Sequence, residues 1–84
     1  MMTQYLIMCK SLTAAQRSQK FLERSGIYAS LIKAPQGLNT NGCGYALSLR
    51  RRADEAIILL RRNGMLAGKI FKHLDSGDYV EQFD

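Results

Sequence analysis

QYLIMC, the stretch Gln4–Cys9, decides the fold of this chain. It is too short for a helix, and it carries apolar side chains at both parities. A strand of this kind is usually covered on both faces, so it is predicted to lie in the middle of a sheet. The rest of the chain must therefore supply partners for its two edges and apolar cover for its two faces.

The residues that follow predict a helix over residues 13–25. Apolar side chains repeat there at helical spacing, and Gly26 ends the helix where a left-handed backbone is needed. Two residues compete for the N-cap. One is Ser11, and the other is Thr13, which fits a capping box with Gln16.

Three further strands and a second helix complete the pattern. Strands are predicted over residues 27–33, 45–49 and 69–74, and the helix runs from residue 53 until Asn63-Gly64 ends it. The order βαββαβ favours an α+β ferredoxin-like sandwich. In this fold two helices cover one face of a four-stranded antiparallel sheet. The second face of the central strand is also apolar, so we expect a homodimer or a docked tail to cover it.

Length and composition fit one small domain, predicted over residues 1–74, followed by an acidic C-terminal tail over residues 75–84. The chain contains no apolar run of the ~18–20 residues that a membrane span needs. Its start lacks the basic region of a secretory signal, so we expect a cytoplasmic protein without membrane association. The net charge is +5, and all 12 lysines and arginines precede the tail, which suggests an anionic partner.

Cys43 is the residue most suited to chemistry. It lies between Gly42 and Gly44, at the end of a polar loop that begins at Pro35. Glycines remove side-chain cover and let backbone N–H groups approach the sulfur, and such donors lower the pKa of a thiol. Two cysteines and one histidine, widely separated, do not form a metal-binding pattern, and no cofactor is expected.

The predicted topology gathers basic residues and a helix N-terminus at the end of the sheet where Cys43 lies. A helix N-terminus carries about half a positive charge, which favours an anionic thiolate nearby. The residues expected to support Cys43 at this end are Cys9, Lys10, Thr13, Arg61, Arg62 and Lys69.

The segment Pro35–Leu47, with its Cys43-Gly44 pair after a proline-led loop, resembles a family of small domains described as selenium/sulfur carrier protein-like. The resemblance implies a cysteine that holds sulfur or selenium as a persulfide or selenosulfide and passes it to protein partners. That role would fall to Cys43, with Gly44 and Pro35 as parts of the motif. The chain offers no paired carboxylates near the loop and no Ser-His-Asp set, which favours a carrier or binding module over a self-sufficient enzyme.

Several alternatives stay open at this point. Cys9 either pairs with Cys43 to release the cargo or ends a buried strand. The run Arg50-Arg51-Arg52 either binds an anion or forms a solvated turn. The domain could serve as a regulatory scaffold that dimerises through its sheet. It could also bind nucleic acid, with Tyr5 and Tyr45 as the bases' stacking partners on the central strands.

Overall fold

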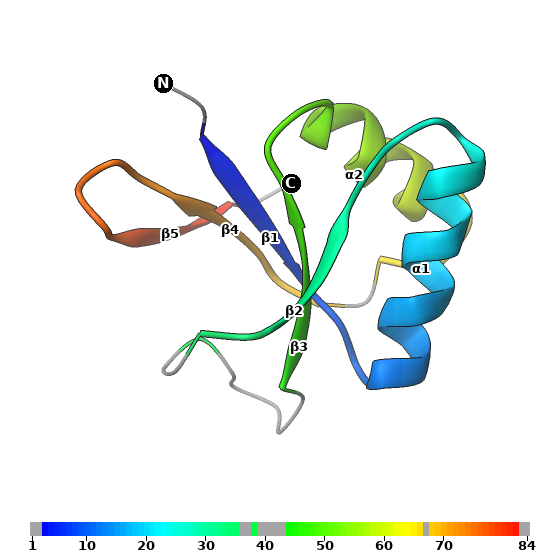
Figure 1. The fold of residues 1–84 in the computed structure, drawn as a ribbon, viewed down its shortest axis with the longest axis horizontal. Coiled ribbons are helices and arrows are strands. Elements are labelled where there is room, and N and C mark those ends of the chain that lie inside the picture. Colours follow the sequence, from blue (N-terminus) through cyan, green and yellow to red (C-terminus); the bar gives the residue numbers. More distant parts are fainter. Residues whose placement is uncertain (1–2, 36–37, 39–43, 67, 83–84) are drawn as a thin grey trace.

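A computed structural model describes residues 3–35, 38, 44–66 and 68–82. Figure 1 shows two helices beside a twisted sheet. In chain order, the elements are β1 (Gln4–Met8), α1 (Leu12–Arg24), β2 (Ser30–Lys33), β3 (Tyr45–Leu49), α2 (Ala53–Arg62), β4 (Ile70–His73) and β5 (Tyr79–Gln82).

The strands form one antiparallel sheet in the order β2-β3-β1-β4-β5. Strand β1 pairs with β3 on one edge, where Ile7 lies opposite Leu47, and with β4 on the other, where Leu6 lies opposite Phe71. The prediction that Gln4–Cys9 contains a central strand next to β3 is therefore confirmed. The α+β class and the two helices are confirmed as well.

The prediction of four strands is wrong, because the segment expected as a tail contributes β5. This strand pairs with β4 at the edge of the sheet, with Tyr79 opposite His73. The rings of these two residues are stacked, with centroids 4.2 Å apart and planes 10° from parallel. The sequence pattern does not predict this strand because the segment is short and polar. Its pairing and its ring contact involve residues of another element.

Helix α1 begins and ends as local sequence rules dictate. Of the two competing N-caps, Ser11 is the one used, since its Oγ accepts from the Ala14 N–H at 3.1 Å. At the other end Gly26 has φ +81°, and the Ile27 N–H donates to the Leu22 carbonyl at 2.9 Å. In the part of the chain that the structure describes, neither helix is long and apolar enough to cross a bilayer.

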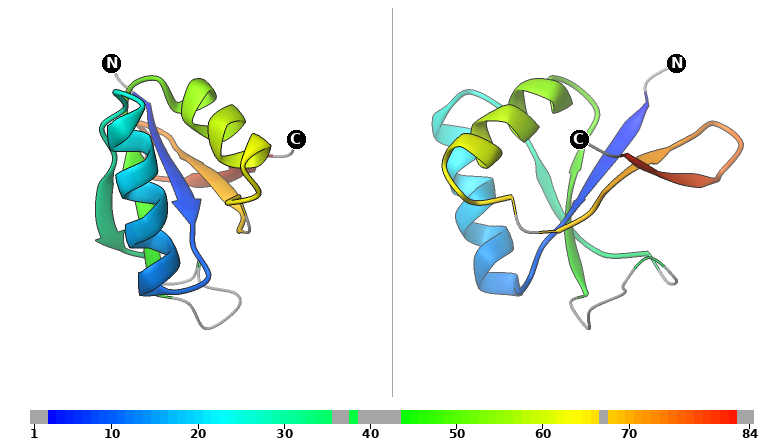
Figure 2. Two further views of the ribbon diagram at one scale, coloured as in Figure 1. Left: turned by 90° about the vertical axis from the view of Figure 1, so that its right-hand side faces the viewer. Right: turned by 180° about the vertical axis from the view of Figure 1, so that it is seen from behind.

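Both helices lie on the same side of the sheet (Figure 2). The main core forms between the helices and this face, where Ile7, Leu47 and Leu49 meet Leu22 and Leu60. All five side chains are at most 2% exposed. This packing explains the alternation of β3, whose large apolar residues face the helices.

The second face of the sheet is covered in part by the chain itself. Leu6, Met8, Ala46 and Phe71 are buried there. Partly buried side chains pack against them, namely Ile32, Ala34, Leu38 and Tyr79. We expected either a docked tail or a second copy of the chain to cover this face. The tail does so in part, because Tyr79 packs against it.

Candidate functional site

The loop that carries Cys43 joins the sheet at the end where β1 finishes. The Cys9 N–H donates to the Tyr45 carbonyl at 3.1 Å, and the Ala34 N–H donates to the Gly44 carbonyl at 2.7 Å. Both ends of the predicted loop are thus fixed at the end of the sheet where β1 finishes. Cys43 and Gly42 themselves lie outside the described residues.

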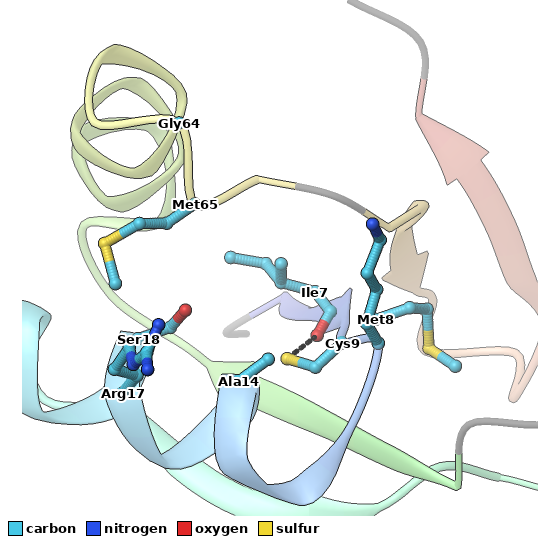
Figure 3. A pocket seen from close by; sticks show the side chains of 9 residues that line it. Ile7, Met8, Cys9, Ala14, Arg17, Ser18, Gly64 and Met65 are labelled. Carbon is cyan, nitrogen blue, oxygen red and sulfur yellow. Dashed lines mark hydrogen bonds between the residues drawn. The ribbon is translucent and has the colours of Figure 1, made fainter.

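A cavity of about 220 Å³ opens at this end of the domain. Three parts of the chain form it: the end of β1, the first turns of α1, and the segment after α2 (Figure 3). The described residues that line it are Ile7, Met8, Cys9, Lys10, Ala14, Arg17, Ser18, Gly64 and Met65. None of them is acidic, and two of them are cations.

Cys9 borders this cavity from the core. Its side chain is 9% exposed and belongs to the cluster between sheet and helices, and its Sγ donates to the Ile7 carbonyl at 3.5 Å. Figure 3 shows the Cys9 sulfur turned toward Ala14 of α1, while the Met65 side chain reaches toward the same helix. Cys9 is thus buried at the end of a central strand, while its predicted pairing with Cys43 involves a residue outside the described ranges.

The basic residues predicted to gather here do so only in part. Lys10 lines the cavity, whereas Thr13 is exposed in the first turn of α1 and does not line it. Arg61 lines a separate hollow between α2 and β4, and Lys69 Nζ lies 3.7 Å from the Glu81 carboxylate. Arg62 is exposed at the end of α2.

Sequence reasoning missed Arg17 and Met65, which also line the cavity. A signal for Arg17 existed: it follows Ala14 by three residues and so lies on a neighbouring part of the α1 surface. Met65 had no comparable signal, because the path of the chain after α2 depends on tertiary packing.

The arginine run lies at the opposite end of β3, and one of its members is structural. Arg52 has a left-handed backbone, φ 57° and ψ 29°, at the N-cap of α2. Its guanidinium donates to both carboxylate oxygens of Glu55, at 2.8 and 3.3 Å, and to the Gly26 carbonyl at 2.8 Å. The hydrogen bonds to Glu55 and the negative charge of its carboxylate raise the pKa of Arg52. The hydrogen bonds from Arg52 and its positive charge lower the pKa of Glu55.

The tyrosines considered for base stacking do not lie on the second face of the sheet. Tyr5 and Tyr45 both pack against the cluster that faces the helices. The reason is parity, since each shares its side of the strand with large core residues such as Ile7 and Leu47. Stacking of bases on these two rings in the manner of an RNA-binding sheet therefore has no support from this arrangement.

The fold and the cavity define a small α+β domain with a cationic hollow at the end of the sheet where the segment containing Cys43 begins and ends. Residues 4–72 match the family described as "Putative Se/S carrier protein-like", and the chain belongs to this family. No curated protein and no solved structure matches the chain.

Proposed function

We propose that this protein carries a sulfur or selenium atom on Cys43 and passes it to partner enzymes. The observation that supports the proposal is membership of the carrier-like family over residues 4–72, a range that contains Cys43. Gly44 follows Cys43 directly in the chain, and its carbonyl is held by Ala34 at the end of the sheet where the cavity opens. The residue that follows Cys43 is thus fixed at that end of the sheet.

Loading would be a thiol exchange that needs no oxidant. The Cys43 thiolate attacks the outer sulfur of a persulfide on the donor protein, and a new S–S bond forms as the donor's own S–S bond breaks. The donor cysteine leaves as a thiolate. Delivery repeats the step, with the acceptor as nucleophile and the Cys43 thiolate as the leaving group, so a lowered pKa at Cys43 helps the second step.

The charges at this end of the domain suit such a thiolate. Lys10 and Arg17 line the cavity, and the N-terminus of α1, which begins at Leu12, has no acidic residue in its first turn. Cations and a helix N-terminus both favour the ionised form of a thiol. A carrier also needs no catalytic acid or base, because its partner enzymes supply them.

The proposal is tested by incubating the protein with a cysteine desulfurase and cysteine and measuring the intact mass. The expected result is a gain of one sulfur atom, about 32 Da, that a reducing agent removes. Cys43→Ala should show no gain, whereas Cys9→Ala should gain the same mass as wild type. A small-molecule persulfide offered in parallel separates an unsuitable donor protein from an unreactive cysteine. An unchanged wild-type mass with both donors, or equal gains on wild type and Cys43→Ala, would contradict the proposal.

A further inference from the structure

A second hollow, of about 500 Å³, lies at the other end of β3 from the Cys43 loop. Its walls include Arg50 and Arg51, which follow β3, and Tyr28, which precedes β2. Ser30 and Ser48 lie opposite each other on these two strands and also line it. Since Leu47 and Leu49 face the helices, Ser48 between them faces away, so the hollow opens on the second face of the sheet.

Tyr28 is the most unusual residue of this hollow, because its side chain is 81% exposed. Its neighbours Ile27 and Ala29 are buried in the main core, which fixes the backbone on both sides of it. A ring held out from a fixed backbone contributes little to the core. It offers a flat apolar face at low entropic cost to a ligand that stacks on it.

The cations of this hollow divide into two kinds. Arg52 is engaged with Glu55 and with the Gly26 carbonyl. Arg50 and Arg51 are exposed, and within the described ranges no ion pair or hydrogen bond involves their side chains. These two guanidiniums are therefore available to an anion, and guanidinium geometry matches phosphate particularly well.

We propose that this hollow binds a nucleotide, with its base stacked on Tyr28 and its phosphate held by Arg50 and Arg51. The combination of a flat exposed ring with available guanidiniums is the one that single-stranded nucleic acids use. An acidic peptide would use the arginines but would have no need of the ring. Ser30 and Ser48 add polar groups to the lining of the hollow, and the Ser48 hydroxyl accepts a hydrogen bond from the Gln4 side chain. The volume also lies within the usual range of ligand sites.

Two sources could supply the nucleotide, namely a single-stranded nucleic acid or a free mononucleotide. The test is fluorescence anisotropy with a labelled single-stranded RNA of about 12 nucleotides, a length within the usual site sizes, at about 50 and about 200 mM salt. Binding of the RNA with no displacement by millimolar uridine or adenosine monophosphate assigns the site to a strand. If these nucleotides displace the RNA from the wild-type protein, and Tyr28→Ala abolishes this displacement, the site is assigned to the free nucleotide.

Variants distinguish the contribution of base stacking to the binding affinity from the contribution of charge. Tyr28→Ala should weaken binding about five-fold or more, the loss expected for one stacked base, whereas Tyr28→Phe should keep most of the affinity. The double change Arg50→Gln, Arg51→Gln should reduce the salt slope by about 0.7, since the two arginines hold one phosphate and each neutralised phosphate of a single strand contributes ~0.7. Lys20→Gln, which removes an exposed charge from α1, is the matched control and should change the affinity less than two-fold.

Three results would overturn the proposal: no binding of either probe at the lower salt, binding that Tyr28→Ala leaves unchanged, or equally tight binding of polyglutamate. Since Tyr28 is so exposed, its variants are expected to fold, and circular dichroism verifies this. Cys43→Ala should bind the probe like wild type, so the result is independent of the proposed carrier function.

Discussion

Gly68 lies where the backbone entering β4 passes so close to β1 that no side chain fits between them. A Cβ atom built at this position would collide with the carbonyl oxygen of Met8 and lie 2.7 Å from its carbonyl carbon. The close approach also carries a hydrogen bond, from the Met8 N–H to the Lys69 carbonyl, at 2.8 Å. Both atoms that would be hit belong to the backbone, so neither can rotate away.

Gly68→Ala should therefore destabilise the protein by about 1–3 kcal/mol, the usual cost of forcing extra volume into a packed site. Thermal and urea unfolding measure the change. Gly44→Ala is the matched control, because no described atom lies within 4 Å of a Cβ built there and its φ is not positive. Equal stability of Gly68→Ala and wild type would show that the two strands can separate without cost.

Single residues of the site were predictable to the extent that local rules apply to them. The left-handed Gly26 and the burial of Cys9 follow from helix termination and from the apolar run of β1. The positions of Arg61 and Lys69 were not predictable in this way. Arg61 lies on α2 and Lys69 directly precedes β4, and the rotation and register of these elements are set by packing against other elements. A small rotation decides whether a side chain reaches the cavity.

At the scale of elements, the start of α2 depends on a contact that is sensitive to pH. Arg52 and Glu55 are three residues apart, with side chains 47% and 57% exposed. The hydrogen bonds and charge of Arg52 lower the pKa of Glu55. A carboxyl whose pKa is lower in the folded state stabilises the fold above its unfolded-state pKa, and this contribution disappears as pH falls through the folded-state pKa.

A double-mutant cycle with Arg52→Gln and Glu55→Gln should therefore show a favourable coupling at pH 7 that disappears in acid, below the ordinary range of glutamate, about 4.3. The coupling should be small, because solvent screens exposed pairs, and it should weaken further in high salt. Urea unfolding of the four proteins across pH measures it. A coupling of the same size at neutral and acid pH would mean that the carboxylate charge plays no part in holding Arg52.

The elements themselves were predictable where the sequence pattern is local. Helix α1 was expected over residues 13–25 and runs over Leu12–Arg24, while β3 matches its predicted range. Strand β2 begins at Ser30, three residues later than predicted, because Ile27 and Ala29 are buried beside the end of α1 before pairing with β3 begins. Strand β5 was missed, since its stability comes from β4 and not from its own residues.

At the scale of the whole molecule, the second face of the sheet is apolar and must be covered. The sequence did not determine which part of the protein covers it. The sequence predicted that this face needs cover, but a docked tail and a second copy of the chain satisfy the pattern equally well. The choice depends on whether residues after β4 turn back. They do so at Gly77, with φ +95° and its N–H bonded to the Leu74 carbonyl at 2.9 Å. Tyr79 then packs beside Phe71 and His73.

Deleting residues 79–84 should accordingly convert a covered face into an exposed one. Phe71 loses the Tyr79 contact, and the edge of β4 loses its hydrogen-bonding partner. We expect the free energy of unfolding to fall by about 2 kcal/mol or more, since burial of one large aromatic side chain contributes that much. The uncovered apolar patch and strand edge should also promote self-association.

Unfolding curves, binding of an apolar dye and light scattering over a range of concentrations measure these effects. Val80→Ala serves as the control, because Val80 lies on the same strand but is 42% exposed and should leave stability and oligomeric state nearly unchanged. If the shortened protein were as stable and as monodisperse as the full chain, β5 would not be needed to cover the sheet. The apolar side chains of β1 on this face, Leu6 and Met8, would then be sufficiently shielded by Ile32, Ala34 and Leu38 alone.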